Sequence, residues 1–232
     1  MNTSISENIA QVSTQITRAC QLAGRASDSV SLLAVSKTRP AEDIRSAYAC
    51  GLTRFGENYL QEALDKIEQL ADLPLEWHFI GPIQSNKTRP IAEHFHWVHS
   101  VDRLKIAQRL SEQRPADLPA LNICLQVNIS REESKSGCLP EQALELAQAL
   151  SELPNLRLRG LMAIPRATED EQDQRRAFAD LRQLLERLQQ ALPGLDTLSM
   201  GMSGDLIPAI AEGATIVRIG TALFGARVPK NA

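Results

Sequence analysis

Short apolar runs alternate with longer amphipathic stretches along the whole chain. Runs rich in Val, Ile, Leu, Phe and Trp that are bounded by polar or turn-forming residues predict buried strands. These runs cover 31–37, 53–58, 76–81, 96–101, 121–129, 156–164, 197–201 and 215–220. Stretches with apolar residues three and four positions apart predict helices. They cover 4–24, 40–50, 60–67, 84–95, 102–113, 140–152, 171–192 and 206–212, with a last turn or helix at 222–226.

The strict alternation of strands and helices indicates a parallel sheet, because each helix then serves as the crossover between neighbouring strands. Eight such units close a (β/α)8 barrel of the TIM type, with the helix at 4–24 as an extra N-terminal element. An open doubly wound sheet is the alternative, but no G-x-G-x-x-G turn follows the first strand. No linker rich in Pro, Gly or Ser divides the chain, so we expect one α/β domain over residues 1–232.

Composition and charge narrow the class of protein. The 232 residues are 43% hydrophobic and 23% charged, which is ordinary for a soluble globular protein. A net charge of −3 without a long basic block argues against nucleic-acid binding, and no apolar stretch is long enough to cross a membrane. The N-terminal residues do not resemble a signal peptide, and the four cysteines form no C-x-x-C pair. We therefore expect a cytoplasmic protein with free thiols and no metal site.

A lysine ends the first predicted strand. Side chains alternate along a strand, so Leu33, Val35 and Lys37 share one face. A desolvated lysine loses its proton readily, and the neutral amine can form a Schiff base with a carbonyl compound. The alternative is that Lys37 clears the strand end and points into water, as most lysines do.

Polar residues also follow the last two predicted strands, where barrels of this type often hold a phosphate. Ser203 lies in the loop MGMSGD before a short helix, and Gly220 and Thr221 follow the eighth strand directly. Their hydroxyl and main-chain N–H groups predict an anion site. Structural alternatives are that Ser203 caps its helix, that Gly220 forms a turn, and that Arg218 pairs with a carboxylate of the barrel such as Glu57.

Seven motifs together resemble the pyridoxal phosphate homeostasis protein family (YggS/PROSC). They are AVSK, FGENY, WHFIGPIQSNK, SKSG, RGLMAIP, MGMS and VRIGTALFG, in this order over nearly the whole chain. The resemblance implies a barrel similar to the N-terminal domain of alanine racemase. It further implies that Lys37 holds pyridoxal 5′-phosphate as a Schiff base. The other implied cofactor positions are Ser203, Gly220 and Thr221 at the phosphate, Arg218 at the pyridine nitrogen and Asn58 close to the cofactor.

Three functions are compatible with these residues. The first is a pyridoxal phosphate-binding protein of intracellular cofactor homeostasis without dedicated catalysis. It is favoured because an Arg at the pyridine nitrogen makes the ring a weak electron sink, and because the sequence ends soon after the eighth strand. The second is a small racemase-like enzyme dependent on pyridoxal phosphate. The third is a phosphosugar-type barrel enzyme that uses Lys37 without a cofactor.

The expected partners follow from the first function. The small-molecule cofactor is the primary ligand, and pyridoxal phosphate-dependent apo-enzymes are candidate recipients. We expect a monomer, because building the barrel leaves no large apolar face over.

Overall fold

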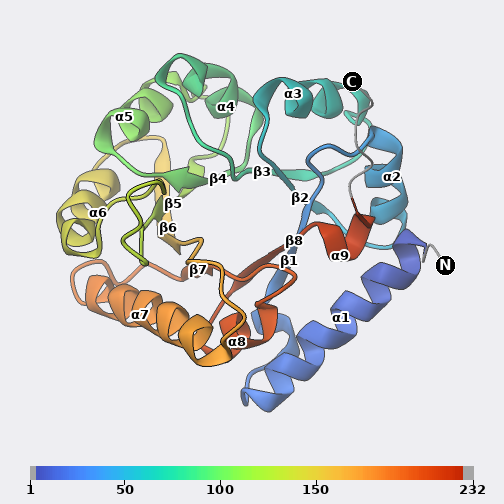
Figure 1. Ribbon diagram of the computed structural model, residues 1–232. Coiled ribbons are helices and arrows are strands. Elements are labelled where there is room, and N and C mark those ends of the chain that lie inside the picture. The colour runs from blue at the N-terminus through green and yellow to red at the C-terminus, as the bar shows by residue number, and fades with distance from the viewer. Residues whose placement is uncertain (1–3, 227–232) are drawn as a thin grey trace.

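The computed structural model describes residues 4–226 and contains a closed barrel of eight parallel strands in sequence order (Figure 1). The strands are β1 (Ser31–Val35), β2 (Arg54–Glu57), β3 (Glu76–Phe79), β4 (Trp97–Val101), β5 (Leu121–Gln126), β6 (Leu156–Met162), β7 (Thr197–Ser199) and β8 (Ile216–Ile219). Parallel pairing of β1 with β8 closes the ring. The predicted TIM-type barrel is therefore confirmed.

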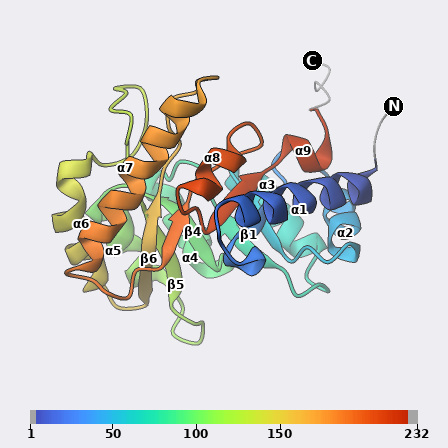
Figure 2. The same ribbon diagram turned by 90° about the horizontal axis from the view of Figure 1, so that it is seen from below.

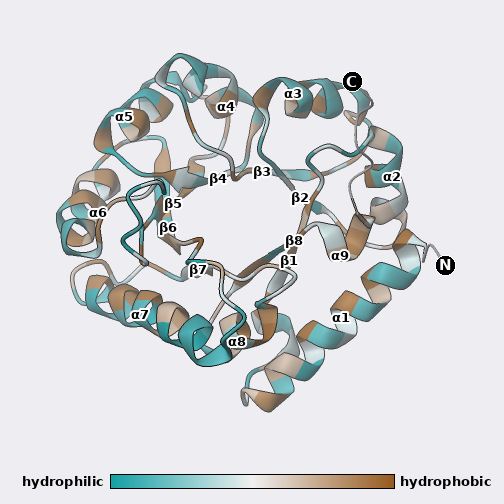
Figure 3. Cartoon of the chain, viewed as in Figure 1, coloured by the Kyte–Doolittle hydropathy of each residue, from teal (hydrophilic) through white to brown (hydrophobic). Residues whose placement is uncertain are grey.

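Helices surround the barrel and alternate with the strands, as the apolar pattern predicts (Figure 1). They are α1 (Ile5–Leu22), α2 (Ala41–Ala49), α3 (Leu60–Gln69), α4 (Thr88–His94), α5 (Leu104–Gln113), α6 (Ala143–Ser151), α7 (Glu171–Gln189), α8 (Leu206–Ala211) and α9 (Thr221–Phe224). Their hydrophobic sides turn towards the strands and their hydrophilic sides away from them (Figure 3). Within residues 4–226, no helix has the length and apolar character needed to cross a bilayer.

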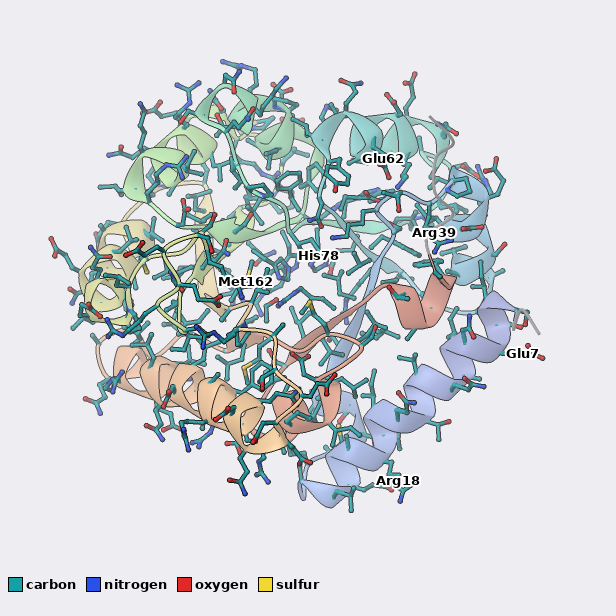
Figure 4. The ribbon with its side chains drawn as sticks, viewed as in Figure 1. Glu7, Arg18, Arg39, Glu62, His78 and Met162 are labelled. Atoms are coloured by element: carbon teal, nitrogen blue, oxygen red, sulfur yellow. The ribbon has the colours of Figure 1, made fainter. Side chains whose placement is uncertain are left out.

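The extra helix α1 lies along the outside of the ring, beside α8 and α9 (Figures 1 and 2). A capping box starts it, in which Ser4 and Glu7 each accept a hydrogen bond from the other's main-chain N–H. Arg18 lies on its outer side (Figure 4), while Ile9 and its apolar neighbours are buried. The Asn8 side chain donates to the Leu223 carbonyl oxygen at 2.9 Å. This bond ties α1 to the short helix that follows β8.

The core has two parts. The larger part lies between the strands and the helices. A smaller apolar cluster fills the barrel interior and contains Leu33, Trp97, Cys124, Met162 and Ile216. His78 and Met162 lie in the middle of the ring (Figure 4). The interior is thus a packed core rather than a pore, as is usual for such barrels.

The structure differs from the predicted elements mainly at the strand ends. The first strand ends at Val35 and the fifth at Gln126, several residues earlier than the apolar runs suggest. Residues 36–37 and 127–129, which the apolar runs assign to strands, therefore belong to loops at the barrel mouth. The helix predicted at 84–95 is divided into a 3₁₀ turn, Ser85–Lys87, and α4. All four cysteines are free thiols, as predicted.

Candidate functional site

The carboxyl ends of β1 and β8 lie side by side. Ala34 of β1 is aligned with Ile219 of β8, so the residues that follow both strands meet at one mouth of the barrel. Lys37, Gly220 and Thr221 line one small cavity of about 40 Å³ there, together with Val35, Thr38, Arg39 and Gly225. The structure therefore brings together three of the predicted site residues.

Gly220 forms the junction between β8 and α9. A Cβ atom at this position would lie 3.2 Å from the Val35 carbonyl oxygen, so the close approach of β8 to β1 favours glycine. The first N–H groups of a helix have no acceptor within the helix. Here Thr221, the first residue of α9, and Lys37 line the same cavity. This arrangement can bind an anion next to an amine.

The turn that carries Lys37 is held from the side of α3. Ser36 donates its hydroxyl to Glu57 Oε1 at 2.6 Å, and Lys66 of α3 donates to the same oxygen at 2.8 Å. Lys66 also donates to the Ser36 carbonyl oxygen at 2.7 Å. These three bonds fix the residue directly before Lys37.

A second bond fixes the residue directly after Lys37. The Thr38 N–H donates to Glu62 Oε1 at 2.5 Å, and Lys66 reaches the same oxygen at 2.5 Å. Thr38 has a positive φ of 64°, which is strained for a β-branched residue. Lys66 thus bridges both flanks of the Lys37 turn.

The Glu57 carboxyl group lies in a fully buried position beneath this turn. Burial raises its pKa, and the bonds from Lys66 and Ser36 oppose that shift. Glu57 Oε2 has no hydrogen-bond partner among the described residues, so Oε1 alone receives the bonds from Ser36 and Lys66. Because Glu57 pairs with Lys66, the alternative that Arg218 pairs with Glu57 is wrong.

Arg218 lies inside the barrel and is 5% exposed. It donates to Ser199 Oγ at 2.8 Å and to the Ala163 carbonyl oxygen at 3.0 Å. Burial lowers its pKa to about 10, so it stays a cation at neutral pH. Ile216, two positions before Arg218 on β8, belongs to the apolar cluster inside the barrel, so Arg218 shares that inward face of the strand. The guanidinium is thus fixed on the interior side of the same mouth.

Asn58 follows β2 and is half-buried. Its neighbour Glu57 contacts α3, so alternation places Asn58 towards the interior. Its Oδ1 is buried without a hydrogen-bond partner in the described part of the chain. An orphaned buried acceptor is costly, and a ligand donor or a water can satisfy it.

Ser203 does not line the cavity of Lys37. It is exposed, in a turn where Asp205 accepts a hydrogen bond from the Met202 N–H at 2.6 Å. This turn lines a larger depression of about 1060 Å³ that also involves Arg18 of α1 and Lys135. The predicted phosphate set is therefore divided between two neighbouring hollows.

Several supporting residues escape prediction from the sequence. Lys66 stands in an ordinary helical pattern, where its spacing of four from Glu62 suggests only a surface pair. Ser199 and His99 occupy apolar strands without a surrounding motif. Period-two alternation places His99 on the face of Trp97 and Ser199 on the face of Thr197, which is the one signal available.

Fold and sequence together define an alanine racemase-type barrel protein. The family model described as "Alanine racemase, N-terminal domain" matches residues 8–228. The chain is 70% identical over 223 residues to the pyridoxal phosphate homeostasis protein of Pseudomonas aeruginosa, with 96% of each chain covered. It is 57% identical over 228 residues to that of Vibrio cholerae, with 97% of each covered. The chain belongs to the pyridoxal phosphate homeostasis protein family.

A solved structure of a relative agrees with this assignment. PipY of Synechococcus elongatus, with PLP bound, is 41% identical to this chain and superimposes with a TM-score of 0.83. The match covers 96% of this chain and all of PipY, 100%. The barrel fold is thus shared with a protein whose structure contains PLP.

Proposed function

We propose that this protein binds pyridoxal 5′-phosphate as a Schiff base on Lys37 and serves intracellular cofactor homeostasis without dedicated catalysis. One observation carries the proposal: the Lys37 amine and the anion-accepting turn at Gly220–Thr221 share one cavity. That pairing suits a ligand with an aldehyde and a phosphate. PipY, a relative at 41% identity, has PLP bound in its structure.

Each site residue has a distinct part in this proposal. Lys37 supplies the amine, and the Thr221 hydroxyl and the first N–H groups of α9 donate to the phosphate oxygens. Arg218 donates to the pyridine nitrogen from inside the barrel, and the orphaned Asn58 Oδ1 gains a partner. Ser203 lines the other hollow in this structure, so its predicted contact with the phosphate requires the β7 loop to approach the Lys37 cavity. The cofactor itself supplies an electron-withdrawing ring.

Arg218 supports the proposed absence of dedicated catalysis. Its guanidinium is a permanent donor, since even with a pKa lowered to about 10 it holds its proton at neutral pH. A donor at the pyridine nitrogen leaves that nitrogen unprotonated, and the ring is then a weak electron sink. Reactions that develop a full carbanion on a bound amino acid should be slow.

The test is an absorption spectrum of the protein after incubation with pyridoxal 5′-phosphate, followed by borohydride reduction and peptide mapping. We expect a visible band and a reduced adduct on the Lys37 peptide. Lys37→Ala should lose both, whereas Lys105→Ala, at an exposed position on α5, should keep both. A colourless protein without an adduct refutes the proposal.

A small racemase-like enzyme is the second candidate, and the match to the alanine racemase N-terminal domain favours it. It predicts exchange of the α-hydrogen of an amino acid with solvent, lost in Lys37→Ala. No exchange in the unaltered protein would exclude it. The third candidate, a cofactor-free phosphosugar enzyme, predicts no visible band.

Location and partners complete the proposal. We propose a cytoplasmic monomer that delivers its cofactor to pyridoxal phosphate-dependent apo-enzymes. The test is transfer: the loaded protein, mixed with an apo-enzyme, should restore that enzyme's activity faster than spontaneous release from the barrel allows. Light scattering checks the oligomeric state.

A further inference from the structure

A chain of buried polar side chains crosses the barrel interior. Glu76 Oε1 and His78 Nε2 are 2.8 Å apart, and His78 Nδ1 and His99 Nε2 are 2.9 Å apart. His99 Nδ1 then lies 2.7 Å from Ser199 Oγ, which accepts from Arg218 at 2.8 Å. The two imidazoles, the hydroxyl and the guanidinium are all buried. Four strands, β3, β4, β7 and β8, therefore contribute to one continuous chain.

The direction of every hydrogen bond in this chain is fixed by its ends. Arg218 can only donate, so Ser199 Oγ accepts from it. Within residues 4–226, the Ser199 hydroxyl proton has one acceptor, His99 Nδ1. His99 must then carry its proton on Nε2 and donate to His78 Nδ1. His78 in turn carries its proton on Nε2.

The other end of the chain demands the same direction. Glu76 is a carboxylate whose pKa is lowered by its hydrogen bond with His78, and a carboxylate only accepts. His78 Nε2–H therefore donates to Glu76. A second proton on His78 would lie on Nδ1 and face the Nε2–H of His99, 2.9 Å away. A second proton on His99 would lie on Nδ1 and face the Ser199 hydroxyl, 2.7 Å away, which would then lose its acceptor. Burial lowers the pKa of both His78 and His99, which agrees with two neutral rings.

Packing holds the rings in this arrangement. Trp97 stacks on His78 with ring centroids 5.4 Å apart and an angle of 6° between the planes. On the far side, Glu76 and His78 line a cavity of about 430 Å³ at the opposite mouth, together with Arg54 and Arg159. Arg54 forms an ion pair with Glu76 at 3.2 Å. The chain thus joins the cofactor side of the barrel to its other mouth.

We propose that Ser199, His99 and His78 are positioning residues for Arg218. Their one-way chain fixes the rotation of the guanidinium and keeps one of its N–H groups occupied. A second N–H, on Nη2, donates to the Ala163 carbonyl oxygen at 3.0 Å, so the two bonds together set the orientation of the guanidinium. The effect on the cofactor rests on the proposed function, whereas the series of hydrogen bonds from Glu76 to Arg218 does not depend on it.

The first experiment uses the full-length protein without cofactor. Nitrogen-15 NMR at neutral pH distinguishes the two tautomers of each imidazole, and single His→Gln variants assign the signals. We expect His78 and His99 to be neutral with the proton on Nε2. A proton on Nδ1 of either ring, or a doubly protonated ring, refutes the proposed direction of the hydrogen bonds.

The second experiment connects the chain to the cofactor. In Ser199→Ala the Arg218 donor loses its acceptor, so we expect a shifted absorption band and an affinity for pyridoxal 5′-phosphate lower by roughly 3- to 10-fold. Ser199→Thr keeps a hydroxyl and should restore the band. Thr197→Val removes a hydroxyl from the same strand outside the chain and should leave the band unchanged.

The outcomes separate the two proposals. A band that forms normally but does not move in Ser199→Ala refutes the positioning role and leaves the proposed function intact. Absence of any band in the unaltered protein refutes the proposed function and the cofactor link with it. The tautomers of His78 and His99, measured without cofactor, test the direction of the hydrogen bonds even if the Ser199→Ala variant does not fold.

Discussion

Replacing Lys66 by Met tests the clamp that holds the Lys37 turn. The Lys66 ammonium donates to the Ser36 carbonyl oxygen and to the carboxylates of Glu57 and Glu62 at 2.5–2.8 Å. The substitution removes all three bonds and leaves the fully buried Glu57 without its cation. Breaking a buried ion pair from one side costs about 3–5 kcal/mol. We expect the free energy of unfolding in urea at pH 8 to fall by that amount.

The pH dependence identifies the cause of this loss. Burial raises the pKa of Glu57, and loss of Lys66 raises it further. A carboxyl group whose pKa is higher in the folded state loses stabilising power as pH rises through that value. The deficit of Lys66→Met should therefore shrink between pH 8 and pH 5. The double variant Lys66→Met/Glu57→Gln should recover about 1–3 kcal/mol of it.

An exposed lysine provides the control for Lys66→Met. Lys105→Met changes an exposed lysine on α5 and should stay within about 0.5 kcal/mol of the unaltered protein. A Lys66→Met protein as stable as that control at pH 8 would show that Glu57 is already neutral and that the clamp contributes little. A deficit independent of pH would mean that lost packing, not the buried carboxylate, causes the destabilisation.

Three further predictions concern the barrel as a whole. Burial lowers the pKa values of His78 and His99 from 6.5. As the pH decreases from 6.5, the free energy of unfolding should therefore decrease by up to about 1.4 kcal/mol per pH unit for each ring. A free energy of unfolding from urea titrations that does not change with pH argues against two neutral rings. A thiol reagent at pH 8 should label the exposed Cys50 first, because burial raises the pKa of Cys124 to about 12; mass mapping checks this. Gly160→Ala should lower the unfolding free energy by about 3 kcal/mol, since its Cβ would overlap a main-chain oxygen of β7; an unchanged urea midpoint contradicts it.

The barrel could be predicted because its signal is local. Each strand and helix carries its own apolar period, so alternation alone specifies the topology. Lys37 and the Gly220–Thr221 turn follow from the same rule, as they stand at the ends of β1 and β8. The outlying position of Ser203 could not be seen, because the path of a loop beyond its strand depends on packing against α1 and Lys135.

The supporting contacts could not be predicted, since they depend on register and on three-dimensional pairing. Glu57 and Lys66 lie on different elements, and the sequence spacing between them fits neither a helix face nor a strand pair. His99 and Ser199 are a hundred residues apart and become neighbours only across the closed barrel. Buried polar residues interrupt the apolar pattern of a strand or helix, although Lys66, His99 and Ser199 all have hydrogen-bond partners in the fold.

Strain and support meet at the Lys37 turn. Thr38 adopts a positive φ of 64°, and such a conformation persists only where the surroundings over-determine it. Here Glu62 holds its N–H, and Lys66 joins Glu62 to the residue before Lys37. A turn fixed on both sides leaves the backbone at Lys37 little freedom, so the start of its side chain has a set position. That rigidity suits a group that must hold one ligand in one orientation, and it suits less well a group that must move between proton donors during turnover.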